Sequence, residues 1–356
     1  MPQESICIKV RKVYGEKTII LAKKLEMVNL QLKIGRNAAF IYIPLIRQPQ
    51  DDELKALKKH VPDLEILMYL FPEKKKRIKT FVELLEDKIS THLLASLPRA
   101  IDFVGDIAII EIPPELNAYK IVIGETILKA HKNVRTVLAK AGAVSGTYRT
   151  RNFDVIAGEP KTDTIHKEYS CQYYVDLAKA YFSPRLSYEH KRVASLIKEG
   201  EAIVDLFAGV GPFAVLIAKT HQNVKIYAVD VNPHALAFLK RNIILNRVED
   251  KVHPILGDAR NAVRDKLSRV ADRVIMNLPE NAIEFVDAAC EVLKPKGGTV
   301  HYYSFVSTSD SLENVKFRFT ETVENMGKKV EKILFSRLVR ETAPYQWQVV
   351  LDAKIH

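Results

Sequence analysis

The 356-residue chain has few cysteines and no long apolar run. Cys7, Cys171 and Cys290 are widely spaced and form no C-x-x-C pair, so the pattern argues against a structural zinc site and predicts buried, reduced thiols. No apolar run approaches the ~20 residues that a bilayer span needs, and residues 1–4 are not typical of a signal peptide. No internal repeat is visible, which excludes solenoids. We therefore expect a cytoplasmic protein that binds no metal and enters no membrane.

Basic residues are in surplus, with 54 Lys and Arg against 43 Asp and Glu and a net charge of +11. Such a surplus favours a polyanionic partner, because cations close to phosphates release condensed counterions. It is not decisive, since thermophilic proteins are also rich in Lys and Glu. A hydrophobic content of 47% is sufficient for a real core, and the length predicts two or three domains.

The N-terminal part of the chain predicts two small α+β domains. Residues 1–72 show strand patterns at 6–10 and 39–44 and helix patterns at 17–25 and 51–59, and the second helix opens with three acidic residues. A basic linker follows at residues 73–79, either a solvated connection or a contact for RNA phosphates.

The second small domain spans residues 80–173. A hairpin is predicted at residues 100–112 around Gly105 and Asp106, and a strand at 162–165. A helical stretch between them is expected to present basic side chains, either to solvent or to RNA; these are Lys129, Lys132, Arg135 and Lys140.

The third domain, residues 174–356, alternates strand and helix patterns. Strands are predicted at 202–205, 225–230, 251–256, 272–277 and 299–305, with helices at 213–219, 234–245 and 283–293. This alternation predicts an α/β fold with a mostly parallel, doubly wound sheet. Ligands of such sheets bind at the carboxyl ends of the strands.

Three carboxylates fall at those strand ends. Asp205 closes the first strand, and Gly209 and Gly211 let the next turn approach a ligand closely. Asp230 closes the second strand, where a carboxylate can bind both hydroxyls of a ribose. Asp258 follows the third strand and can accept a hydrogen bond from the exocyclic amine of adenine.

A dinucleotide site is the rival interpretation, because residues 209–214 match G-x-G-x-x-A. Asp205 would repel a pyrophosphate but suits the cationic end of S-adenosylmethionine. Pro212 also removes a backbone donor that a phosphate would use. A third possibility is that the carboxylates only cap helices. We favour an S-adenosylmethionine site.

Asn277-Leu278-Pro279 follows the fourth strand and resembles the (N/D)PP(Y/F) motif of methyltransferases that act on nitrogens of bases. Leu278 replaces a proline of that motif and Glu280 replaces the aromatic residue that stacks on the base. Stacking on the base must therefore come from elsewhere in the chain.

Together, YFSPRL at 181–186, Glu189, DLFAGVGPF at 205–213, DVNPHA at 230–235 and NLP at 277–279 closely resemble the archaeal-type tRNA (guanine-N1)-methyltransferases. The resemblance implies a Rossmann-like class I methyltransferase domain behind two smaller N-terminal α+β domains, with S-adenosylmethionine as cofactor. It implies methylation of N1 of guanosine 37, with a small N-terminal domain that reads the outer corner of tRNA and the rest holding the anticodon loop. We expect the protein to act as a monomer.

The resemblance also implies residue roles. Glu189 would take the N1 proton, Arg149 would stabilise charge on O6, and Asn277 would distinguish guanine from adenine. Two alternatives stay open: Glu189 could only cap a helix, and Arg149 could bind phosphate together with Arg151. The expected cofactor-binding residues are Tyr181, Arg185, Asp205, Phe207, Gly209, Gly211, Asp230, Asp258, Asn277 and Pro279.

Two other functions fit parts of this sequence. The wybutosine-pathway aminocarboxypropyl transferase looks similar, but that enzyme lacks the Asn-Leu-Pro tripeptide and typically has Glu where this chain has Asp230. A non-catalytic RNA-binding protein with a relic cofactor fold is the other possibility, and the intact set of strand-end residues argues against it.

Overall fold

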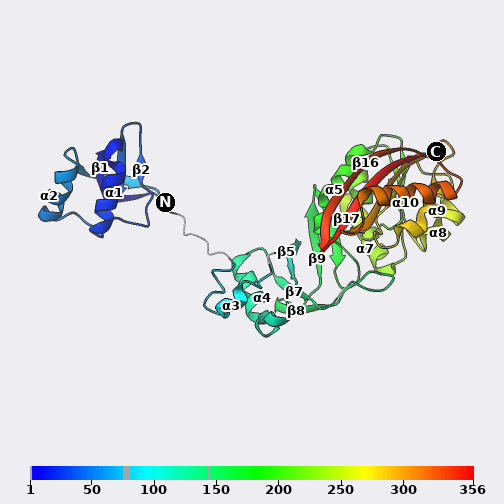
Figure 1. Cartoon of the computed structure of the whole chain (residues 1–356), viewed down its shortest axis with the longest axis horizontal. Coiled ribbons are helices and arrows are strands. Elements are labelled where there is room, and N and C mark those ends of the chain that lie inside the picture. The colour runs from blue at the N-terminus through cyan, green and yellow to red at the C-terminus, as the bar shows by residue number, and fades with distance from the viewer. Residues whose placement is uncertain (1, 75–80, 99, 143) are drawn as a thin grey trace. The chain divides into compact units, whose positions relative to one another are not determined.

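The computed structural model describes residues 2–74, 81–98, 100–142 and 144–356. The chain divides into two compact units, Met1–Lys79 and Thr80–His356 (Figure 1). Residues 75–79 of the expected basic linker lie outside the described residues. The finer division of the second unit into two domains stays a prediction.

The first unit is a four-stranded antiparallel sheet with two helices. Its strand order is β2-β3-β1-β4, formed by Gly35–Arg36, Phe40–Pro44, Gln3–Arg11 and Glu65–Phe71. A 3₁₀ turn at Lys12–Tyr14 leads into α1 (Gly15–Lys24), and α2 spans Asp51–His60. The two predicted helices and two predicted strands are confirmed, whereas β2 and β4 were not predicted. The acidic start of α2 forms a capping box, in which the Gln50 amide donates to the Glu53 carboxylate at 2.8 Å.

The second unit begins with a four-stranded sheet of order β5-β6-β7-β8. Its strands are Ile101–Val104, Ile107–Ile110, Thr136–Lys140 and Phe153–Gly158, and its helical segments are α3 (Thr91–Leu94), a 3₁₀ segment (Pro114–Tyr119) and α4 (Lys120–Ala130). The hairpin predicted around Gly105 is confirmed, and this glycine has φ +56°.

The prediction of one helical stretch that carries four cations is wrong beyond Ala130. Lys129 lies on α4, but Lys132 and Arg135 lie in the following connection and Lys140 ends β7. The run from Thr136 to Ala139 is buried and pairs with both β6 and β8, so sheet pairing on both sides overrides the helical reading. The four cations therefore do not share a helix face.

A two-stranded hairpin follows, formed by β9 (Asp163–Glu168) and β10 (Cys171–Asp176). It leads through a 3₁₀ turn (Pro184–Leu186) into α5 (Ser187–Leu196). The strand expected at 162–165 corresponds to the first half of β9.

The large sheet has seven strands in the order β13-β12-β11-β14-β15-β17-β16. The first five are parallel and β17 and β16 are antiparallel additions. In chain order the strands are Ala202–Asp205, Lys225–Asp230, Val252–Leu256, Arg273–Met276, Gly298–Ser307, Val330–Ala343 and Gln346–Ile355. The five predicted strands and the doubly wound topology are confirmed; the C-terminal hairpin was not predicted.

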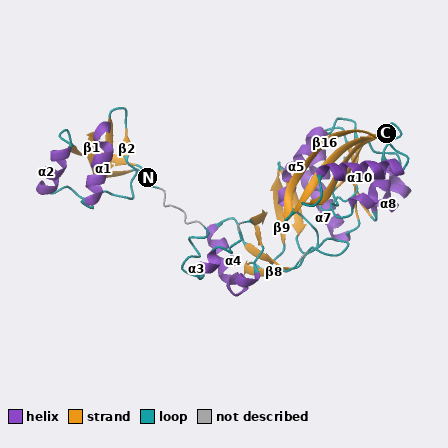
Figure 2. Cartoon of the chain, in the orientation of Figure 1, coloured by secondary structure: helices purple, strands orange, loops and turns teal. Residues whose placement is uncertain are grey.

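Helices cover both faces of this sheet (Figure 2). Successive strand residues therefore point alternately into two cores, one on each face of the sheet. Ile203 packs with α5, α6 (Pro212–Thr220) and α7 (Pro233–Asn246). Its neighbour Val204 packs on the opposite side, where α8 (Ala259–Ala262), a π-helical turn (Val263–Leu267), a 3₁₀ turn (Ala282–Phe285), α9 (Val286–Val292) and α10 (Leu312–Asn325) lie.

Cys7, Cys171 and Cys290 are buried and unpaired, as predicted. In the part of the chain that the structure describes, no helix combines the length and the apolar character that crossing a membrane requires.

Candidate active site

A pocket of about 450 Å³ lies at the carboxyl ends of β11, β12, β13 and β14. This is the edge at which the topology predicts a ligand. Eight of the predicted site residues line it, namely Arg149, Tyr181, Phe207, Gly209, Asp230, Asp258, Asn277 and Pro279. Glu189, Arg185, Asp205 and Gly211 are absent from the lining.

The glycine turn between β11 and α6 explains why two of its residues are glycine. Gly211 is the N-cap of α6 with φ +88°, and a Cβ there would come within 2.3 Å of Leu239. Gly209 has φ +55°, and its amide donates to Asp230 Oδ2 at 2.6 Å. Gly211 therefore shapes the turn from behind, while Gly209 lies at the pocket.

Asp230 and Asp258 each place a carboxylate in the pocket wall. Asp230 Oδ1 accepts the amide of Asn232 at 2.8 Å, and burial raises the pKa of this carboxyl despite its backbone donors. Asp258 caps α8 by accepting amides of Arg260 and Asn261 through Oδ1. Helix capping thus occurs at Asp258, but it uses only one of the two carboxylate oxygens.

Asp205 lies behind the pocket wall and is fully buried. Its Oδ1 accepts the Phe207 amide at 3.3 Å, and its Oδ2 has no hydrogen-bond partner in the described chain. Burial raises the pKa of this carboxyl to about 7, and the nearby Asp230 carboxylate adds to the shift. A buried acid with an unsatisfied oxygen fits a cationic ligand group in the adjoining cavity.

The pocket lining also includes Arg149, Tyr181, Asn277 and Glu280. Arg149 pairs with Glu280 at 2.5 Å, and its guanidinium lies 5.9 Å from the centre of the Tyr181 ring. Glu280 replaces the aromatic residue of the related motif, so here it supplies a counter-ion rather than a stacking surface.

Sequence reasoning missed the residues that the C-terminal hairpin adds to the pocket. Arg340 on β16 and Gln348 on β17 both line the pocket. Gln348 donates to Asn277 Oδ1 at 3.2 Å, and Arg340 donates to Gln348 Oε1 at 3.0 Å. The resemblance extends over this segment, but without the hairpin no signal joined these side chains to the site.

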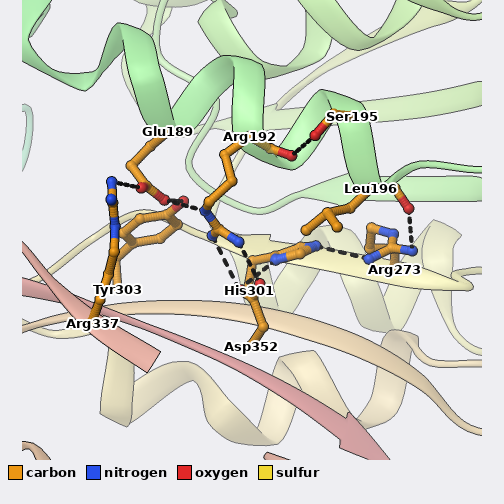
Figure 3. A network of polar contacts seen from close by, with 9 residues as sticks. All are labelled: Glu189, Arg192, Ser195, Leu196, Arg273, His301, Tyr303, Arg337 and Asp352. Carbon is orange, nitrogen blue, oxygen red and sulfur yellow. Dashed lines mark hydrogen bonds and ion pairs between the residues drawn. The ribbon is translucent and has the colours of Figure 1, made fainter. Parts of the chain in front are cut away.

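Glu189 lies in a buried polar network (Figure 3). Its carboxylate accepts hydrogen bonds from Arg192 at 2.9 Å, Tyr303 at 2.9 Å and Arg337 at 2.6 Å. Arg192 continues the network to Asp352, which accepts from it and contacts His301. Burial opposes ionisation of Asp352, yet the His301 and Arg192 partners outweigh it and hold the pKa at about 2.

Arg185 is turned to Asp102 on β5, where its Nε donates at 2.5 Å. His190, the residue after Glu189, lines the pocket and holds its Nδ1 2.8 Å from Glu168. No pattern in the sequence marked His190.

The doubly wound sheet, its glycine turn and the strand-end pocket define a class I methyltransferase domain. Family profiles match three consecutive segments: the tRNA methyltransferase 5 N-terminal domain at residues 7–53, the TYW2 N-terminal domain at 81–162 and the TRM5/TYW2 methyltransferase domain at 164–333.

Full-length relatives agree with these profiles. The chain is 38% identical over 353 residues to the tRNA (guanine(37)-N(1))-methyltransferase Trm5b of Pyrococcus abyssi, covering 99% of both chains. It is similar to the structure of the complex of aTrm5 and tRNALeu, with a TM-score of 0.73 and 33% identity over 99% of this chain and 100% of that one. It is also similar to Methanocaldococcus jannaschii TYW2 in complex with AdoMet, with a TM-score of 0.56 and 31% identity over 72% and 99%.

The chain belongs to the TRM5/TYW2 methyltransferase family, and over its whole length it is similar to relatives of the Trm5 type. The aminocarboxypropyl alternative has less support, since the tRNA(Phe) (4-demethylwyosine(37)-C(7)) aminocarboxypropyltransferase of Methanocaldococcus jannaschii matches 70% of this chain, against 99% for the Trm5b relative.

Proposed function

We propose that the chain transfers the methyl group of S-adenosylmethionine to N1 of guanosine 37 of tRNA, with the strand-end pocket as the reaction site. The observation that carries the proposal is the composition of the pocket lining, in which the carboxylates of Asp230 and Asp258 occur together with Arg149 and the Asn277 amide. Asp230 and Asp258 would bind the ribose hydroxyls and the adenine amine. Asp205 would favour the cationic methionine end. When bound, the cofactor supplies an electrophilic methyl group on a cationic sulfur.

Arg149, Tyr181 and Asn277 would hold the target base. Guanine N1 must lose its proton before its lone pair can attack, and charge then moves to O6. Arg149 would exchange part of its contact with Glu280 for a charge-assisted hydrogen bond to O6. Tyr181 lies below the Arg149 guanidinium and would support its position, and Asn277 would bind the base edge.

Two carboxylates compete for the proton-accepting role. The resemblance favours Glu189, and this role stays a prediction, since three side-chain donors from Arg192, Tyr303 and Arg337 already bind the carboxylate outside the pocket lining. Glu189 would have to release at least one donor when RNA binds. Glu280 is the rival, because it lines the pocket three residues after Asn277.

We also propose how the RNA is bound. The relative in complex with tRNALeu supports tRNA as the partner. Residues 1–72 would read the outer corner, and the second unit would hold the anticodon loop with guanosine 37 flipped into the pocket, at a cost of a few kcal/mol. Arg185 would contact the target nucleotide after leaving Asp102. A cytoplasmic monomer fits this activity.

Mass spectrometry of nucleosides tests the proposal. Unmodified tRNA transcript is incubated with the protein and S-adenosylmethionine, digested and analysed. The proposal expects 1-methylguanosine from a guanosine-37 transcript and none from a transcript with another base at that position. An aminocarboxypropyl adduct would establish the alternative reaction, and no adduct on RNA despite cofactor binding would contradict both.

A further inference from the structure

Three side chains from separate elements form a chain of hydrogen bonds along the pocket wall: Arg340 on β16, Gln348 on β17 and Asn277 after β14. Arg340 and Gln348 are paired across the β16–β17 ladder, which brings their side chains together. Gln348 is 1% exposed, so water does not compete for its amide.

Arg340 sets the donor-to-acceptor direction of this series of hydrogen bonds. A guanidinium has only donors, whereas a side-chain amide has one acceptor oxygen and one donor nitrogen. Arg340 uses all three nitrogens, because Nε donates to Gln348 at 3.0 Å and the two others donate to Ser183 at 3.0 Å and to the Tyr181 hydroxyl at 3.1 Å. Gln348 must therefore present its oxygen to Arg340.

The consequence passes to Asn277. With its oxygen on Arg340, Gln348 turns its NH₂ group to Asn277, where it donates to Oδ1 at 3.2 Å. Asn277 in turn directs its own NH₂ group away from Gln348. A lone asparagine amide could rotate by half a turn at little cost, but this one is oriented by a fixed cation two residues away in the hydrogen-bond chain.

We infer that Arg340 and Gln348 are positioning residues that orient the Asn277 amide and thereby select an oxo group over an amino group at position 6 of the target purine. The inference rests on the proposed function. An NH₂ group facing the base donates to O6 of guanine, whereas the 6-amino group of adenine offers only further donors. Two residues of the C-terminal hairpin, Arg340 and Gln348, thus determine that the Asn277 amide presents a hydrogen-bond donor to the base.

Gln348→Glu tests this directly. A carboxylate beside Arg340 keeps the contact with that cation but has no hydrogen to donate, so the Asn277 amide must turn and present its oxygen to the base. The substrates are two tRNA transcripts that carry guanosine or 2,6-diaminopurine at position 37 and so differ only in the oxo or amino group at position 6 and the accompanying N1 proton. The quantity measured is the ratio of the kcat/KM values for methyl transfer to the two RNAs.

For Gln348→Glu the expected guanosine-to-diaminopurine ratio is at least tenfold lower than for the wild type, with S-adenosylmethionine affinity unchanged. Gln346→Glu is the matched control, because Gln346 is on the same strand with its side chain on Thr342 and outside the pocket, and its ratio should match the wild type. Arg340→Met should also lower the ratio, because Gln348 loses the partner that orients it.

An unchanged ratio in a folded, cofactor-binding Gln348→Glu protein overturns the inference while the proposed function stands. If that variant does not fold, Arg340→Met decides by the same ratio. A wild-type protein that methylates neither RNA overturns the proposed function instead.

Discussion

Glu189 and His190 are consecutive residues of α5, but only His190 lines the pocket. Glu189 points into the network of Arg192, Tyr303 and Arg337. The residue expected to accept the N1 proton is therefore held by two arginines, and which carboxylate performs this step is a question for kinetics.

Paired substitutions answer it. If Glu189 takes the proton, Glu189→Gln lowers the single-turnover methyl-transfer rate by about 10²-fold or more, with RNA and cofactor affinities little changed. Glu280→Gln then has a small effect. The opposite ranking would assign the proton to Glu280. Thermal unfolding of both variants is the control, because Glu189→Gln also removes charge from a buried network.

The cofactor end gives a second prediction. Asp230→Ala should weaken S-adenosylmethionine binding by about 1.5–3 kcal/mol, because ribose hydroxyls would lose a charged acceptor and the Gly209 amide would lose its partner. Isothermal titration calorimetry measures this, with Asp250→Ala as an exposed control. An unchanged dissociation constant in a folded Asp230→Ala protein would remove this residue from the site.

Asp205 should make stability depend on pH. Its pKa of about 7 lies above that of an unfolded aspartate, so the folded state binds more protons between pH 4 and 7 and loses stability as the pH rises through that window. Asp205→Asn keeps the oxygen that accepts from Phe207 and removes the charge. The free energy of unfolding of the Asp205→Asn protein, minus that of the wild type, should increase by a few kcal/mol from pH 4 to pH 7 and remain constant at higher pH. A difference that does not vary with pH would show that Asp205 is not titrating there.

The two-unit division yields a prediction about RNA. Removal of residues 1–79 should leave cofactor binding intact, because the pocket belongs wholly to the second unit. Methylation of full-length tRNA should fall more than methylation of an anticodon stem-loop, as measured by kcat/KM for the two RNAs. Equal losses on both would mean that the first unit is not a separate reader of the outer corner.

The sequence predicted the parallel half of the large sheet well, because buried strands such as 202–205 and 225–230 are short apolar runs that end in functional carboxylates. It did not predict β16, whose exposed and half-buried residues give no clear alternation and whose pairing with β17 is interrupted by register shifts. It also placed Lys140 on a helix, since pairing of β7 with two neighbours is not visible locally.

The candidate site could likewise be predicted only in part. Asp230 and Asp258 could be found because Asp230 ends β12 and Asp258 follows β13 after one glycine, and chain position fixes where a strand end lies. Arg340 and Gln348 could not, because their role depends on a hydrogen-bond chain between segments more than sixty residues from Asn277. The direction in which the Glu189 side chain turns depends likewise on Tyr303 and Arg337, which only tertiary structure brings to α5.

β17 follows β16 along the chain but lies inside the large sheet, between β15 and β16. Until β17 has been synthesised, β15 has an open edge, the Arg192 guanidinium lacks Asp352, and Asn277 lacks Gln348. A nascent or C-terminally truncated chain therefore carries the cofactor turn and the strand-end carboxylates without a finished base-binding end. By the role inferred for Gln348, base selection depends on β17, whereas the glycine turn and the strand-end carboxylates precede it in the chain.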